Sequence, residues 1–191
     1  MIVYIHGFNS SPASAKARLL RERLTALGRT REFAVPALPH SPAAAASLLD
    51  AQISSYREAC LVGSSLGGYY ATWLAERHRL RAVLVNPAVR PSALLAQAIG
   101  RQKNLHTGEE YDFTRRHVEE LQALEVDKVT PELYFLLVET GDEVLDYRQA
   151  VERYGGARQL VIAGGDHGFS DFSAYLDTVL EFCGIAEHAR R

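Results

Sequence analysis

Residues 59–75 read ACLVGSSLGGYYATWLA, and this stretch indicates the fold class of the whole chain. Their first five residues are a continuous apolar run, which is typical of a strand buried on both faces. A helical pattern follows from about residue 67 to residue 78. The turn between strand and helix is the sequence GSSLG at 63–67. A strand that passes directly into a helix predicts an α/β protein.

The same alternation of apolar runs and helical patterns extends along the chain. Strands are predicted at residues 2–5, 32–35, 59–63, 81–85, 133–138 and 159–162. Apolar strands separated by helices predict a parallel sheet covered on both faces by right-handed crossovers. We therefore expect a single three-layer α/β/α domain over residues 1–191, with a six-stranded parallel sheet in the order 2-1-3-4-5-6. The polar residues 187–191 are expected to form a frayed tail.

Residues 91–130 depart from this alternation because they contain no predicted strand. Helical patterns near 92–99 and 114–124 are joined by the polar stretch 101–108. Long excursions between strands of a compact domain tend to be functional, so we expect a helical insertion that caps a site. The alternative is an ordinary crossover with extra helix.

Composition and charge exclude several classes of protein. The 191 residues carry 21 Lys and Arg against 23 Asp and Glu, so no basic field favours nucleic acid or an anionic membrane. Residues 1–7 have neither the basic nor the long apolar region of a signal peptide, so none is expected there, and no apolar run approaches the roughly 20 residues of a membrane span. The two cysteines, Cys60 and Cys183, show no CxxC spacing and are expected to be buried thiols of a reducing compartment. These features predict a cytoplasmic protein.

The GSSLG turn is the strongest chemical signal. A serine at a sharp turn between strand and helix projects its oxygen above the sheet, at a helix N-terminus that favours developing negative charge. Ser65 is at the centre of the motif and is the predicted nucleophile, whereas Ser64 is expected to point back into the sheet. A phosphate-binding turn or a plain loop is the alternative.

Two later loops supply the groups that a serine nucleophile needs. His167 lies in GGDHGF at 164–169, just after the last strand, and is the predicted general base. Asp142 comes first after the glycine that ends the fifth strand, and we expect it to orient the imidazole. Asp146 is the alternative for that role, although it could instead cap a following helix.

The loop after the first strand is predicted to stabilise an oxyanion. Acyl transfer needs N–H donors aimed at the developing negative charge. The backbone N–H of Leu66, next to the nucleophile, is one predicted donor, and that of Phe8 is the other, with Asn9 as its alternative. His6 precedes this loop and is expected to hold it by hydrogen bonds.

These segments together resemble the α/β-hydrolases and, more narrowly, the small bacterial YqiA-type esterases. The similarity extends over nearly the full length and rests on five blocks: HGFNSSPASAK at 6–16, VGSSLGGYYATWLA at 62–75, VNPAVRP at 85–91, TGDEVLDYRQAV at 140–151 and GGDHGF at 164–169. The resemblance implies a compact hydrolase fold without the first two strands of larger members. It also implies activity toward short acyl esters or acyl thioesters, with Ser65, Asp142 and His167 as the triad.

The prediction is therefore a serine hydrolase of small-molecule esters that uses no metal and no organic cofactor. An acceptor other than water would make the same triad an acyltransferase. A non-catalytic binding protein with the hydrolase fold is an alternative of another class. A flavodoxin-like or phosphate-binding protein is disfavoured, because the chain has neither a GxGxxG sequence nor a suitably placed P-loop lysine.

Overall fold

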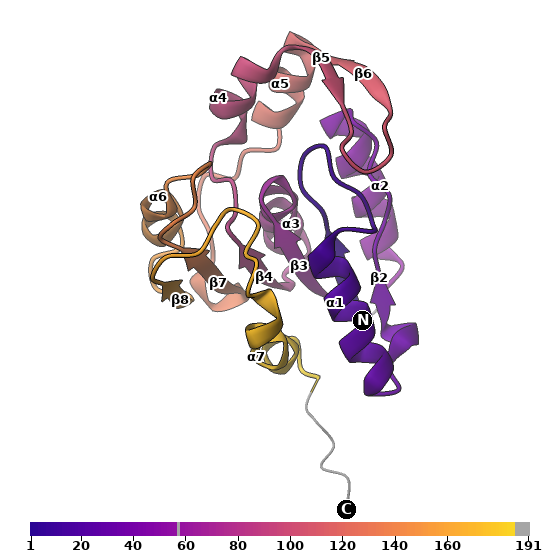
Figure 1. Cartoon of the computed structure of the whole chain (residues 1–191), viewed down its shortest axis with the longest axis vertical. Coiled ribbons are helices and arrows are strands. Elements are labelled where there is room, and N and C mark those ends of the chain that lie inside the picture. Colours follow the sequence, from indigo (N-terminus) through magenta and orange to yellow (C-terminus); the bar gives the residue numbers. More distant parts are fainter. Residues whose placement is uncertain (57, 186–191) are drawn as a thin grey trace, which may run out of the picture.

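The computed structural model describes residues 1–56 and 58–185 (Figure 1), so the expected frayed tail lies outside the described residues. The strands are β1 (Ile2–Ile5), β2 (Phe33–Ala34), β3 (Cys60–Ser64), β4 (Arg81–Val85), β5 (Gly100–Lys103), β6 (Glu110–Phe113), β7 (Tyr134–Glu139) and β8 (Arg158–Ile162). The α-helices are α1 (Ala15–Ala26), α2 (Pro42–Ser54), α3 (Leu66–His78), α4 (Pro91–Leu95), α5 (Arg115–Gln122), α6 (Tyr147–Arg153) and α7 (Leu176–Phe182). Short 3₁₀ turns occupy Thr30–Glu32, Ala96–Ala98, Pro131–Leu133 and Phe172–Tyr175.

Within the described residues, six parallel strands form one sheet in the order β2-β1-β3-β4-β7-β8. The predicted arrangement is confirmed, because β7 and β8 are the fifth and sixth strands of the prediction. In register, Ile5 of β1 pairs with Gly63 of β3, and Ser64 pairs with Val85 of β4. The loops that follow these strands therefore start from the same edge of the sheet, where open α/β sheets form their sites.

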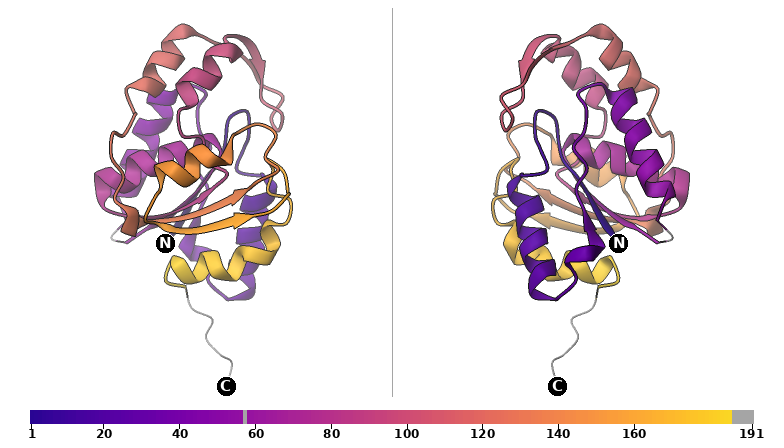
Figure 2. Two further views of the ribbon diagram at one scale, coloured as in Figure 1. Left: turned by 90° about the vertical axis from the view of Figure 1, so that its left-hand side faces the viewer. Right: turned by 90° about the vertical axis from the view of Figure 1, so that its right-hand side faces the viewer.

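The two faces of the sheet are covered by different helices. Val3 and Leu61 belong to the core beneath α2, α3 and α6. Their chain neighbours Tyr4 and Val62 point the other way, into the core beneath α1 and α7. Figure 2 shows α1 and α7 on one side of the sheet and α3 and α6 on the other. Burial on both faces explains why the strands are nearly continuous apolar runs.

The insertion between β4 and β7 differs in part from the prediction. The expected helical patterns form α4, followed by the turn Ala96–Ala98, and α5. The polar stretch between them is an antiparallel hairpin, in which Gly100 pairs with Phe113 and Lys103 with Glu110. The expectation that this segment contains no strand is wrong. Gly100–Lys103 contains no apolar side chain, and Glu110–Phe113 alternates acidic and aromatic residues over only four positions, which is too short a pattern to predict a strand.

Cys60 and Cys183 form a disulfide bond, so the expectation of two free thiols is wrong. Cys60 lies in β3, and Cys183 directly follows α7. Their Cα atoms are 5.3 Å apart although 123 positions separate them in the sequence. The bond ties the last helix to the centre of the sheet.

Candidate functional site

Ser65 occupies the turn between β3 and α3. Its backbone has φ 55° and ψ −122°, which is strained for a residue with a side chain. A Cβ atom on Gly67 would lie 1.9 Å from the carbonyl oxygen of Ile5, and one on Gly63 would lie 2.4 Å from that of Gly67. Only glycine fits at these two positions. The tight turn that they permit places Ser65 at the N-terminus of α3.

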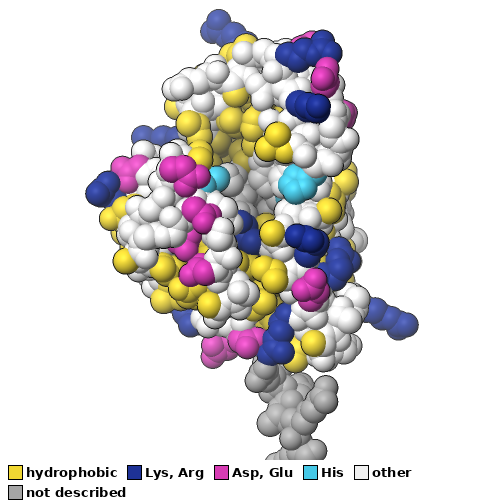
Figure 3. Space-filling view, viewed as in Figure 1, with side chains coloured by type: hydrophobic (Ala, Val, Ile, Leu, Met, Phe, Trp, Pro, Cys, Tyr) yellow, Lys and Arg dark blue, Asp and Glu magenta, His cyan; other side chains and the backbone are white. Residues whose placement is uncertain are grey.

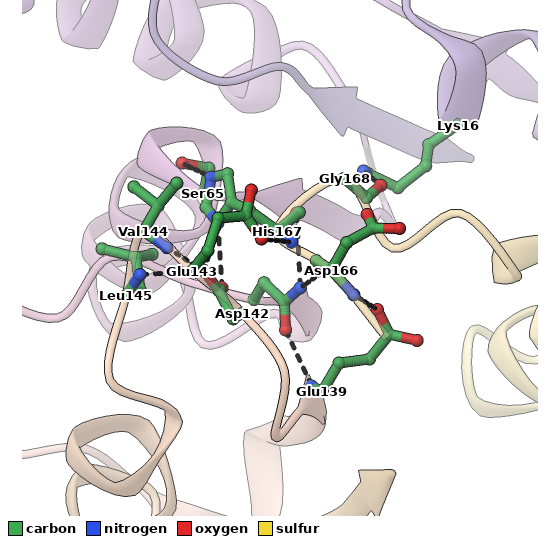
Figure 4. A network of polar contacts seen from close by, with 11 residues as sticks. Lys16, Ser65, Glu139, Asp142, Glu143, Val144, Leu145, Asp166, His167 and Gly168 are labelled. Atoms are coloured by element: carbon green, nitrogen blue, oxygen red, sulfur yellow. Dashed lines mark hydrogen bonds and ion pairs between the residues drawn. The ribbon is translucent and has the colours of Figure 1, made fainter. Parts of the chain in front are cut away.

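Two loops bring an imidazole and a carboxylate to this serine (Figure 4). The Nε2 atom of His167 lies 3.0 Å from Ser65 Oγ. Its Nδ1 atom lies 2.8 Å from Oδ2 and 3.0 Å from Oδ1 of Asp142. An ionised carboxylate can only accept, so Nδ1 carries the proton and Nε2 keeps the lone pair that accepts from the serine hydroxyl. This arrangement allows the imidazole to remove the serine proton.

Both carboxylate oxygens of Asp142 accept hydrogen bonds. Its side chain is 2% exposed, and Oδ1 also accepts hydrogen bonds from the backbone N–H groups of Val144 and Leu145, both at 2.8 Å. Asp146, the alternative, accepts instead from the N–H of Arg148 at 3.0 Å and caps α6. The carboxylate brought to the imidazole is therefore that of Asp142.

The backbone N–H groups predicted as oxyanion donors lie beside the serine. Leu66 is the first residue of α3, so its N–H has no acceptor within the helix. The loop that carries Phe8 runs past the serine so closely that a Cβ atom on Gly7 would lie 3.2 Å from Ser65 Cβ. Phe8 and Leu66 both line the same cavity, of about 50 Å³. Figure 3 shows this face of the molecule hollowed, with histidine side chains on two sides of the hollow.

His6 has the structural role that the sequence suggested. Its Nε2 atom accepts from the N–H of Leu38 at 3.3 Å, so Nδ1 carries the proton and donates to the carbonyl oxygen of Gly7 at 3.1 Å. The residue is 5% exposed, and burial lowers the pKa of its imidazole. The neutral ring therefore ties the first loop to the segment after β2.

Asn86 is a residue whose importance the sequence did not reveal. It follows β4, has φ 40° and is 2% exposed. Its Nδ2 atom donates to the carbonyl oxygens of Asp166 at 3.0 Å and His167 at 3.3 Å, and its Oδ1 accepts from the N–H of Glu139 at 3.0 Å. One amide thus joins the ends of β4 and β7 to the loop of His167. In the sequence, Asn86 is only the residue that follows the strand predicted at 81–85.

Glu139 is a charged residue at the end of the otherwise apolar strand β7. It is 1% exposed, and its carboxylate accepts from the N–H of Asp166 at 2.9 Å. Burial raises the pKa of Glu139, and the neighbouring carboxylate of Asp171 raises it further. The one feature of the sequence that could have indicated this role is a carboxyl group at the end of an otherwise apolar strand.

Two further side chains hold the His167 loop from outside. Oε2 of Glu143 accepts the N–H of His167 at 3.0 Å. Lys16, at the start of α1, donates from Nζ to the carbonyl oxygen of Gly168 (Figure 4). Burial lowers the pKa of Lys16, and the carboxylates around the loop act against that effect. His167 is therefore held by hydrogen bonds to its imidazole ring, to its backbone N–H and to the carbonyl oxygens of residues 166–168.

Across residues 1–56 and 58–185, no three His, Cys, Asp or Glu side chains gather in a way that could hold a metal ion. Nor do these residues include a helix with the length and apolar character needed to cross a membrane.

Comparison with solved structures defines the class of fold. The chain matches alpha/beta hydrolase domain-containing protein 10 from mouse with a TM-score of 0.71 at 17% identity, covering 94% of this chain and 89% of that chain. It matches Est1E from Butyrivibrio proteoclasticus with a TM-score of 0.71 at 16% identity, over 95% and 85% of the two chains. The monoacylglycerol lipase of Paleococcus ferrophilus gives 0.66 at 16% identity, over 95% and 94%. The fold is that of the α/β-hydrolases.

The family follows from the sequence itself. Residues 1–184 match the model of the uncharacterised protein family UPF0227, and the chain belongs to this family. This is the YqiA family that the five sequence blocks indicated, so the predicted resemblance is confirmed.

Proposed function

We propose that this protein is a serine esterase that hydrolyses small carboxylic esters through an acyl-enzyme intermediate. The observation that carries the proposal is the continuous line of hydrogen bonds from Asp142 through His167 to Ser65. The strained backbone of Ser65 and its position at a helix N-terminus support the same role.

In the first half of the reaction, His167 removes the proton of Ser65 while Oγ attacks the acyl carbon. The negative charge moves to the former carbonyl oxygen, where the N–H groups of Phe8 and Leu66 are proposed to stabilise it. His167 then gives the proton to the departing alcohol oxygen or thiol sulfur. The bond between the acyl carbon and the leaving group breaks, which leaves the acyl group on Ser65.

In the second half, His167 removes a proton from a water molecule that attacks the acyl-enzyme. Collapse of the second tetrahedral intermediate returns the proton to Ser65 Oγ and releases the acid. Asp142 keeps the imidazole in one tautomer and stabilises the cation that forms twice in each cycle. These steps use only side chains, backbone N–H groups and water, so we propose that no cofactor takes part.

The substrate class that we propose is short acyl esters, with acyl thioesters as close analogues. Among the structural neighbours, one carries the name monoacylglycerol lipase, and Est1E binds ferulic acid. We also propose that residues 91–130 cap the site within a single domain. In support, Asn104, Glu109 and Tyr111 of the insertion line the same cavity as Phe8 and Leu66.

The proposal is tested by combining covalent labelling with turnover. A fluorophosphonate probe is expected to label Ser65 of the wild type and to leave Ser65→Ala unlabelled. p-Nitrophenyl acetate and butyrate are expected to be hydrolysed by the wild type, with kcat lower by about 10⁴-fold or more in Ser65→Ala. A wild type that neither labels nor turns over either ester would favour the non-catalytic binding protein.

A further inference from the structure

The hairpin β5–β6 contacts the loop that carries the proposed oxyanion donor Phe8 (Figure 1). The Asn9 side chain is held at both ends: Tyr111 Oη donates to its Oδ1 at 2.6 Å, and its Nδ2 donates to Gln102 Oε1 at 3.1 Å. The carbonyl oxygen of Asn9 accepts from the N–H of Leu105 at 3.2 Å. These bonds join segments that lie more than 90 residues apart in the sequence.

The neighbours of Asn9 on both sides are held by the same hairpin. The carbonyl oxygen of Ser10 accepts from Nδ2 of Asn104 at 2.9 Å. The ring of Phe8 packs edge-on against Phe113, with centroids 5.4 Å apart. Three consecutive residues of the loop are therefore fixed by the insertion.

Asn9 needs this support because of its backbone. Its φ is 52°, in the left-handed region that residues other than glycine rarely adopt. Phe8 directly precedes this turn, so anchoring the Asn9 side chain and the Phe8 ring restricts the backbone of Phe8, which carries the proposed donor N–H. Burial raises the pKa of Tyr111 to about 12, which keeps its hydroxyl protonated as a donor.

The hairpin can act as a rigid support because the insertion is itself fixed to the body of the protein. Tyr69 Oη, from α3, donates to the carbonyl oxygen of Leu121 in α5 at 2.7 Å. Glu120 of α5 accepts from the hydroxyl of Ser41 at 2.8 Å and from the N–H of Ala43 at 3.1 Å, at the start of α2. Contacts with both helices oppose free movement of the insertion.

We propose that the β5–β6 hairpin positions the oxyanion hole, and that Tyr111 and Gln102 are positioning residues that act through Asn9. This proposal rests on the serine esterase function proposed above. An oxyanion donor is effective only when it already points to where the charge will develop. The insertion is therefore a fixed part of the catalytic apparatus, rather than a lid that must open and close over it.

The test uses variants of the two side chains that hold Asn9. Tyr111→Phe removes the hydroxyl but keeps the ring that stacks on His40. Gln102→Ala removes the acceptor for Asn9 together with the bond from Gln102 Nε2 to the carbonyl oxygen of Ala98 at 2.7 Å. Gln102→Glu keeps an acceptor oxygen for Asn9 and loses only the donor to Ala98. Tyr56→Phe is the matched control. Its hydroxyl also takes part in one hydrogen bond, accepting from Gln52 Nε2 at 3.0 Å. It lies between α2 and β3, at the amino end of the strand, whereas the site lies at the carboxyl ends.

We expect kcat for p-nitrophenyl butyrate to fall about 10-fold in each single variant and about 100-fold in Tyr111→Phe/Gln102→Ala, with KM changed less than threefold. Inhibition by phenylboronic acid, whose serine adduct places an oxygen in the oxyanion hole, should weaken in proportion to kcat/KM. The pH profile of kcat/KM should be unchanged, because the bond between His167 and Asp142 is untouched. Gln102→Glu should lose less kcat than Gln102→Ala, because an acceptor for Asn9 remains, and Tyr56→Phe should stay within twofold of the wild type.

The inference is overturned if the single and double variants keep wild-type kcat while Ser65 still labels and the wild type turns over ester. It is also overturned if kcat falls without a matching loss of boronate affinity, or together with a shifted pH profile. If the double variant does not fold, the single variants decide. Failure of the proposed function looks different, because the wild type itself would then neither label nor hydrolyse ester.

Discussion

Replacing Asn86 with glycine is expected to lower both the stability and the activity of this protein. The buried amide makes three hydrogen bonds, to the carbonyl oxygens of Asp166 and His167 and from the N–H of Glu139, at 3.0, 3.3 and 3.0 Å. Its φ of 40° is readily adopted by glycine. Asn86→Gly therefore removes the side-chain bonds without straining the turn.

The size of both effects follows from these contacts. A hydrogen bond contributes a net stabilisation of about 1 kcal/mol, so three bonds amount to about 3 kcal/mol. The greater freedom of glycine in the unfolded chain adds up to about 1 kcal/mol. The free energy of unfolding should therefore fall by about 3 to 4 kcal/mol. Because a catalytic group displaced by about 1 Å can lose 100-fold in rate, kcat/KM should fall by about 10- to 100-fold.

Urea unfolding and the hydrolysis of p-nitrophenyl butyrate measure the two effects separately. Arg79→Gly is the matched control, since Arg79 also has a positive φ, 56°, but is exposed at the end of α3. It gains the same freedom in the unfolded chain and should change stability by no more than about 1 kcal/mol, with full activity.

Two results would refute the reasoning about Asn86. If Asn86→Gly loses stability but keeps kcat/KM within twofold of the wild type, the amide does not position His167. If its free energy of unfolding equals that of the wild type, the three hydrogen bonds do not stabilise the fold as calculated.

Three other changes have defined outcomes. Asp142→Asn should lower kcat/KM for p-nitrophenyl butyrate by about 10⁴-fold, because an amide no longer holds the imidazole in the productive tautomer; a loss below 10-fold would contradict this. Reductant should lower the melting temperature of the wild type but not that of Cys60→Ala/Cys183→Ala. A cross-link over 123 positions reduces the entropy of the unfolded chain, which stabilises the folded protein by about 4 to 5 kcal/mol in the chain-entropy estimate. An equal change in melting temperature in both proteins would argue against the bond. The raised pKa of Glu139 means that the folded protein holds this proton more tightly than the unfolded chain, so its contribution to stability is full below the ordinary pKa of 4.5 and is lost as pH rises through the folded-state value. Glu139→Gln, which is neutral at every pH, should therefore gain melting temperature relative to the wild type between pH 4.5 and pH 8, and a difference independent of pH would refute the assignment.

The features that could be predicted from the sequence are those with local causes. The turn at Ser65 has glycines two positions away on each side, and a Cβ atom on Gly63 would collide with Gly67, only four positions further along the chain. The strands of the main sheet could be located because burial on both faces requires continuous apolar runs. Once those strands were ordered, the loops of Ser65, Asp142 and His167 had to start from one edge.

The hairpin β5–β6, the Cys60–Cys183 bond and the amide of Asn86 have no comparable local sign. The hairpin strands GRQK and EYDF are mainly polar, and their contacts with Asn9 and Ser10 join distant parts of the chain.

Short-range sterics and the burial of apolar surface act along the chain, so the layered α/β architecture and the residue types at the ends of its strands follow from the amino-acid sequence. Which polar groups hold the loops in place follows only from the folded arrangement of distant segments. A hydrogen bond or a disulfide depends on the distance between two atoms, and that distance is set by the packing of the whole chain.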